Sequence, residues 1–142
     1  MSETTRRFID SSMLVRYFTD DIPEQAEVAE RIIESDDLLV NSVIVSECGC
    51  VLTKLYAYPR EDVVDTLVAF LLRENVAMPD LPKELAAEAL LRCKGSGRVS
   101  FGDALIIAAM KARGVKEIYS FDRRLESAGI QVLREPPGYR QS

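Results

Sequence analysis

Short apolar segments alternate with helix-length segments along the chain, and this alternation constrains the fold more than any other feature. Apolar residues at helical spacing and helix-start signals predict helices at 12–18, 22–33, 42–56, 59–72, 82–95 and 100–113. The expected strands are 8–9, 38–40, 76–78, 117–121 and 131–133. Strands that alternate with helices usually pair in parallel and are covered by those helices. The sequence therefore predicts an α/β fold with a mostly parallel sheet.

The length and composition are those of one globular domain that fills residues 1–142, with an irregular tail from about residue 135. The longest apolar runs, 67–72 and 104–110, are too short to span a bilayer. The N-terminus MSETTRR lacks the apolar core of a secretory signal, so we expect a cytoplasmic protein with no membrane partner. Cys48, Cys50 and Cys93 are interpreted as small buried hydrophobic residues.

The absence of histidine excludes whole classes of chemistry. Without it the chain has no Ser-His-Asp or Cys-His nucleophile system and no histidine-based zinc site. Catalysis would depend on carboxylates, hydroxyls, Lys, Tyr or a hard metal ion. The formal net charge is −5, so contact with a polyanion would need a local basic patch or a bound cation.

Two aspartates follow predicted strands at the points where ligands bind in open parallel sheets. Asp10 follows the first strand and Asp122 follows the segment Ile-Tyr-Ser-Phe. Ligands of such folds lie at the carboxyl ends of the strands. Each aspartate taken singly is equally a turn or helix-cap residue.

Two further acids lie within or at the start of predicted helices. Glu47 has apolar residues at helical spacing on both sides, and a carboxylate on an apolar face is costly unless it is paired or bound to metal. The alternatives for Glu47 are an exposed helix edge or a salt bridge to Lys54. Asp103 belongs to a capping box that begins at Ser100, and it also points toward an apolar region.

These four carboxylates cannot share a pocket unaided, because their mutual repulsion would raise their pKa values or attract a cation. Oxygen ligands without His or Cys select Mg²⁺, with Mn²⁺ as the other candidate. Such a site suits metal-assisted hydrolysis of phosphodiester bonds.

In order along the chain, the segments FIDSSMLVRYF, VNSVIVSECGCVL, SFGDALIIAAMKARG and EIYSFDRRLE each carry one of the four acids. Together they resemble the PIN-domain nucleases, and in particular the VapC-type ribonuclease toxins of toxin–antitoxin modules. The resemblance implies a catalytic Mg²⁺ site formed by Asp10, Glu47, Asp103 and Asp122, supported by Ser12 and Ser120. It also implies a single-domain α/β/α sandwich of about five strands in the order 3-2-1-4-5, a homodimer, an RNA substrate and a small antitoxin partner. Cleavage would leave a 5′-phosphate and a 3′-hydroxyl.

Arg16, Arg98 and Arg123 are candidates for contact with RNA phosphates, or else ordinary surface charges. Two other functions remain open: a PIN-fold nuclease of RNA processing outside a toxin module, and a non-catalytic module that binds a metal or a partner. A phosphatase with Asp10 as its nucleophile is disfavoured, because Ser12 stands where that chemistry uses a second aspartate.

Overall fold

Helices and short strands alternate along the chain in the computed structural model, which describes residues 6–95 and 97–138. The helices are α1 (Ser11–Phe18), α2 (Pro23–Ser35), α3 (Ser42–Lys54), α4 (Arg60–Leu71), α5 (Lys83–Arg92), α6 (Phe101–Arg113) and the 3₁₀ helix η2 (Arg124–Ala128). The strands are β1 (Arg7–Phe8), β2 (Leu38–Leu39), β3 (Val76–Ala77), β4 (Glu117–Tyr119) and β5 (Gln131–Leu133). The predicted α/β class is confirmed, and η2 is the one element among the described residues that the sequence did not predict.

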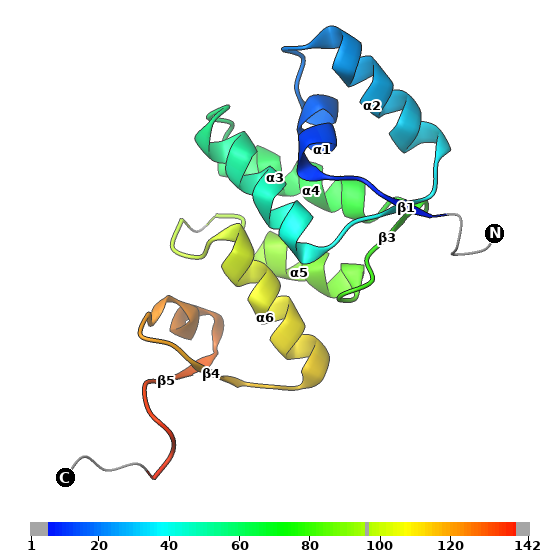
Figure 1. Cartoon of the computed structure of the whole chain (residues 1–142). Coiled ribbons are helices and arrows are strands. Elements are labelled where there is room, and N and C mark those ends of the chain that lie inside the picture. The colour runs from blue at the N-terminus through cyan, green and yellow to red at the C-terminus, as the bar shows by residue number, and fades with distance from the viewer. Residues whose placement is uncertain (1–5, 96, 139–142) are drawn as a thin grey trace.

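The strands pair in parallel, as the sequence predicts, but they form two sheets. One sheet has the order β1-β2-β3, with Arg7 opposite Leu38 and Leu38 opposite Val76. The second sheet pairs β4 with β5. In Figure 1, α2 lies above β1 and β3, and α5 lies below them.

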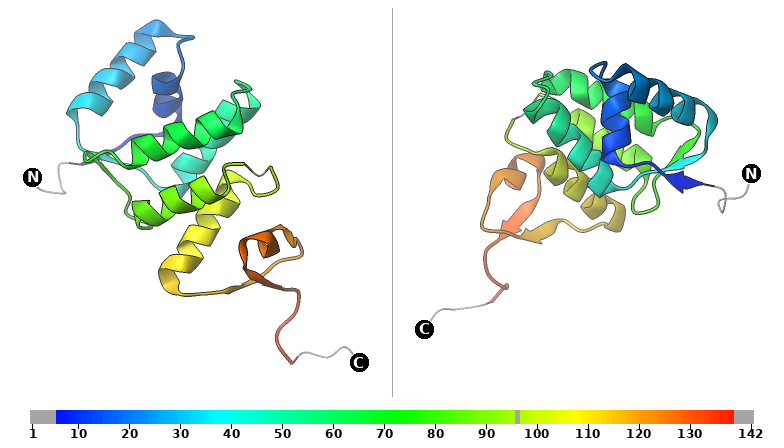
Figure 2. Two further views of the ribbon diagram at one scale, coloured as in Figure 1. Left: turned by 180° about the vertical axis from the view of Figure 1, so that it is seen from behind. Right: turned by 45° about the horizontal axis from the view of Figure 1, so that its top comes forward.

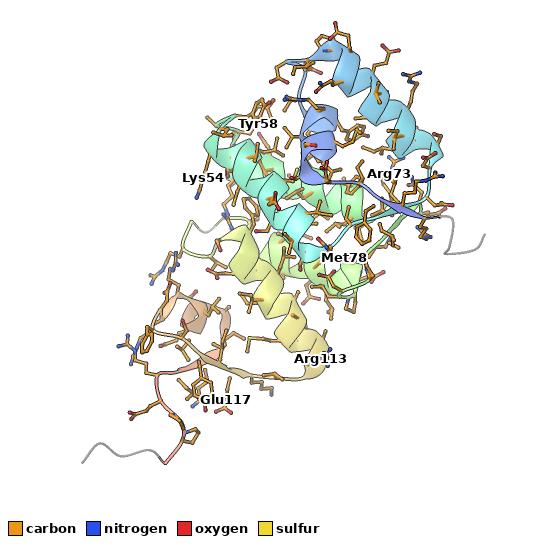
Figure 3. The ribbon with its side chains drawn as sticks, in the orientation of Figure 1. Lys54, Tyr58, Arg73, Met78, Arg113 and Glu117 are labelled. Carbon is orange, nitrogen blue, oxygen red and sulfur yellow. The ribbon has the colours of Figure 1, made fainter. Side chains whose placement is uncertain are left out.

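The expected order 3-2-1-4-5 is therefore interrupted between β1 and β4. The chain leaves α6 through Gly114, which adopts the left-handed conformation that glycine tolerates best, and then turns back along the outer side of α6. Figures 1 and 2 show α6 between β1 and the β4–β5 pair. Arg113 and Glu117, labelled in Figure 3, flank this turn. Among the described residues, β1 pairs only with β2, and β4 only with β5.

The core is built mainly from helix side chains, because no strand in the described ranges is longer than three residues. Leu14, Ile33, Leu52, Leu71 and Leu90 are all fully buried. Apolar area removed from water stabilises the fold by about 25 cal/mol per Å². In the part of the chain that the structure describes, no helix is long and apolar enough to cross a membrane.

Helix boundaries differ from the prediction where local caps end a helix early. The last turn of α5 closes at Cys93, so α5 ends before Gly95. The C-cap of α3 is Leu55, so that helix stops short of Tyr56. Cys48 and Cys93 are buried and Cys50 is half-buried, all three as free thiols, so the interpretation as buried hydrophobes is confirmed for the first two. Residues 134–138 are irregular, as expected, and the rest of the predicted tail, 139–142, lies outside the described residues.

Candidate active site

Asp10 lies between β1 and α1 and caps that helix. Its Oδ1 accepts hydrogen bonds from the backbone N–H of Met13, at 3.1 Å, and from the hydroxyl of Ser12, at 2.7 Å. The bond from Ser12 is the larger cause that lowers the pKa of the Asp10 carboxyl, and the bond from Met13 adds to it. The carboxylate is exposed, and its lowered pKa favours the charged form, which is the form a cation requires. Ser12 thus contacts the acid that it was expected to support.

Glu47 lies beside the start of α1, although it comes from α3. Its Oε2 accepts a hydrogen bond from the hydroxyl of Ser11 at 3.1 Å, so Asp10 and Glu47 are joined through a single intervening residue. The expectation that Glu47 lies on a buried apolar face is wrong. Its side chain is exposed and the nearby Val43 is 61% exposed, because this edge of α3 faces outward.

Asp103 lies in the first turn of α6, and Ser100 caps that helix as predicted, with its Oγ accepting from the Asp103 N–H at 3.0 Å. The start of α6 packs on α3: a Cβ at Gly102 would lie 3.4 Å from the Ser46 hydroxyl. Glu47 follows Ser46 and Asp103 follows Gly102, so each of these two acids is the sequence neighbour of a residue in the contact. A groove of about 400 Å³ runs between the two helices and is lined by Ser46, Glu47 and Gly102.

Asp122 lies on the loop after β4, whose sheet is separate from the sheet that contains β1. Its Oδ2 accepts from the Arg124 guanidinium at 2.6 Å, and its backbone N–H donates to the Ser120 hydroxyl at 3.0 Å. The side-chain bond from Arg124 is the largest cause that lowers the pKa of Asp122, and the charge of Arg98 contributes least. Arg124 is thus the ion-pair partner of a candidate acid.

Within the described residues, which include all four acids, no group of three or more Asp, Glu, His or Cys side chains is close enough together to hold a metal ion. The structure links the residue after Asp10 to Glu47 and places the start of α6 against α3. It pairs Asp122 with Arg124, whose pKa is raised by the charge of Asp103 as well as by Asp122. The donor set nevertheless suits Mg²⁺ in kind, because it consists of carboxylate oxygens in a chain without histidine. The donor set therefore fits the ion by the chemistry of its oxygen atoms, and Ser11 connects the segment of Asp10 to Glu47.

The basic candidates lie in different settings. Arg16 donates to Gln25 at 2.9 Å, to Asp21 at 3.1 Å and to Tyr56 at 2.9 Å, so its guanidinium joins α1, α2 and the turn after α3. Arg123 forms an exposed ion pair with Glu126 at 3.6 Å. The charge of Arg98 contributes slightly to the lowered pKa of Asp122.

Arg60 is a positioning residue that the sequence analysis missed. Its Nε donates to the carbonyl of Cys93 at 3.1 Å and its Nη2 to the carbonyl of Val99, so it ties both ends of the loop before α6. Its guanidinium carbon also lies 4.5 Å from the centre of the Phe101 ring. An arginine at the first position of a helix gives no signal of this role in the sequence.

The model of the PIN domain family matches residues 7–131, so the chain belongs to the PIN-domain family. This membership confirms the resemblance and places the chain in a family of nucleases. Among solved structures, the chain is similar to the crystal structure of Mycobacterium tuberculosis VapC20, a Sarcin-Ricin loop cleaving toxin. The two share 20% identity with a TM-score of 0.43, over 87% of this chain and 95% of that one. A comparison with curated proteins found no match.

Proposed function

We propose that the chain is a Mg²⁺-dependent endoribonuclease that hydrolyses RNA phosphodiester bonds and serves as the toxin of a toxin–antitoxin module. It would act in the cytoplasm as a homodimer and be held inactive by a small antitoxin protein. The observation that carries the proposal is the hydrogen bond between Ser11 and Glu47, which links the residue after Asp10 to a second acid from a distant part of a PIN-domain chain.

In this proposal Asp10, Glu47 and Asp103 hold the ion, and Asp122 completes the set. Mg²⁺, when bound, would neutralise the phosphate and make a water molecule a better nucleophile. Ser12 keeps Asp10 charged and oriented through its 2.7 Å hydrogen bond. Ser120 holds the backbone at Asp122. For Asp122 to join the others, its carboxylate would exchange the guanidinium of Arg124 for the ion.

The position of Asp122 also favours a second candidate, a non-catalytic module that binds a partner or a structural metal. In that case chelation would lower the melting temperature strongly, because a ligand that binds only the folded state stabilises it. A catalytic Mg²⁺ held by exposed carboxylates and water would change the melting temperature little at millimolar concentration.

The test is incubation of structured RNA with the wild type and with Asp103→Asn, each with Mg²⁺ and with chelator. Asp20→Asn is the matched control, because Asp20 is an exposed aspartate outside the candidate site. Cleavage by the wild type and by Asp20→Asn, only with Mg²⁺, and none by Asp103→Asn would support the nuclease. Equal cleavage by Asp103→Asn, or cleavage in chelator, would contradict it.

A further inference from the structure

Both carboxylate oxygens of Asp122 are bound by a single residue, Arg124. Oδ1 accepts from the backbone N–H of Arg124 at 2.9 Å. Oδ2 accepts from Nε of the Arg124 guanidinium at 2.6 Å, and Nη2 of the same group also lies 2.6 Å from it. A carboxylate has roughly four acceptor positions in all. Asp122 therefore has little capacity left for a cation while Arg124 holds it.

The other three candidate acids are held differently. The hydrogen bonds that Asp10 accepts at 2.7 and 3.1 Å both end on Oδ1, and the bond that Glu47 accepts ends on Oε2. In the part of the chain that the structure describes, Asp10, Glu47 and Asp103 form no ion pair. These three can thus receive an ion without first giving up a positively charged partner, whereas Asp122 cannot.

The guanidinium of Arg124 also acts on a second acid. The hydrogen bond and the charge of Asp122 raise the pKa of Arg124, and the charge of Asp103 raises it further. A fixed positive charge beside two carboxylates offsets part of the repulsion that would otherwise draw in a cation. Arg124 therefore supplies, from within the chain, some of the charge that a metal ion would bring.

We propose that Arg124 is a positioning residue that competes with the metal ion for Asp122, so that Asp122 joins the other acids only when the ion displaces the guanidinium. The inference rests on the proposed function, since it concerns the regulation of the same site. The two side chains of the pair are both about half exposed, at 47% for Asp122 and 51% for Arg124. Exposed ion pairs contribute little to stability, so a doubly charged ion can exchange with this one reversibly.

Metal affinity tests the competition without any cleavage assay. We would titrate full-length wild type and Arg124→Gln with Mn²⁺ in the absence of RNA, and follow the free ion by electron paramagnetic resonance. Loss of the competitor predicts about 2- to 5-fold tighter binding of Mn²⁺. Arg113→Gln is the matched control, because it removes the same charge from an exposed residue at the opposite end of α6 from Asp103, and it should bind as the wild type does. Unchanged or weaker binding by Arg124→Gln is the result of a purely structural ion pair and would overturn the proposal.

Two further measurements separate competition for Asp122 from a general effect of charge. In the Asp122→Asn background, Arg124→Gln should lose most of its effect on Mn²⁺ affinity, because the carboxylate it releases is absent. Equal tightening in both backgrounds would overturn the proposal. In the wild type, the Nε–H of Arg124 should exchange with water faster when Mg²⁺ saturates the site, since it then leaves Oδ2 of Asp122. An exchange rate that Mg²⁺ does not change, measured by nitrogen-15 NMR, would likewise overturn it.

Failure of this inference is distinct from failure of the proposed function. Mn²⁺ binding that Arg124→Gln leaves unchanged overturns the competition alone. Absence of Mn²⁺ binding by the wild type would contradict the metal site of the proposed nuclease and the competition with it. The cleavage assay with Asp103→Asn decides the nuclease separately, because every readout here is taken without RNA.

Discussion

Gly49 and Phe101 pack so closely that a Cβ atom at residue 49 would lie 2.8 Å from two carbons of the Phe101 ring. Gly49 is buried in α3, two residues after Glu47, and Phe101 begins α6, two residues before Asp103. This contact therefore sets how near the helix of one candidate acid comes to the helix of another.

Gly49→Ala should destabilise the protein even though alanine favours helices. The methyl group would overpack the contact with Phe101, at a cost of about 1–3 kcal/mol. That cost exceeds the gain of about 1 kcal/mol from helix propensity. Urea unfolding followed by circular dichroism would measure the net loss. Gly95→Ala is the control, since a Cβ there has no neighbour within 4 Å, and a stability of Gly49→Ala at or above the wild type would contradict the packing argument.

Arg60→Lys should lower the free energy of unfolding by about 1–3 kcal/mol, because a lysine cannot serve both the Cys93 and Val99 carbonyls while lying over the Phe101 ring. The same substitution should reduce RNA cleavage if the loop before α6 positions Asp103. Arg31→Lys on the exposed side of α2 should change stability by less than about 0.5 kcal/mol. Equal unfolding midpoints for the two variants would show that the Arg60 contacts add nothing.

Tyr56→Phe should destabilise the protein more at neutral pH than at about pH 2.5. The Tyr56 hydroxyl donates to Asp21 at 2.7 Å and is the largest cause that lowers the pKa of that carboxyl below 3.8. A lowered pKa means that Asp21 contributes stability above 3.8 and loses it as the pH falls through the lower folded value. Unfolding in urea at both pH values would measure the difference between variant and wild type. A difference that is the same, or larger, in acid would contradict this assignment.

Cys48 should resist alkylation in the folded protein. Burial raises the pKa of its thiol to about 12, and the thiolate is the reactive form. Burial also raises the pKa of the Cys93 thiol. Mass spectrometry after treatment with iodoacetamide at about pH 8 should find Cys48 unmodified until guanidinium unfolds the chain, when all three cysteines react. Rapid modification of Cys48 in the native state would show that the core around α3 opens readily.

Local signals in the sequence predicted most of the helices, since their caps and periodicity are encoded within a few residues. Ser100 and Gly114 mark the two ends of α6, and the structure confirms both. The contacts of Asp10 with Ser12 and of Asp122 with Ser120 likewise involve residues two apart, as the resemblance implied.

Relationships between distant segments could not be predicted in the same way. The exposure of Glu47 depends on which edge of α3 the other helices leave uncovered. Apolar neighbours such as Val43 suggested a buried face, but Val43 is itself exposed. The contacts of Arg60 with Cys93, Val99 and Phe101 depend on how α4 packs beside the loop before α6. The gap between β1 and β4 depends on the direction the chain takes after Gly114.

The separation of β4, η2 and β5 from the first sheet has a consequence for how the molecule fluctuates. In the described ranges these elements make extensive contact only with one another, and Leu125 is their one buried side chain. A part of the chain held so lightly exchanges its amide hydrogens through local opening, with much less free energy than global unfolding requires. We therefore expect β4, η2 and β5 to move relative to α6 without unfolding of the helical core.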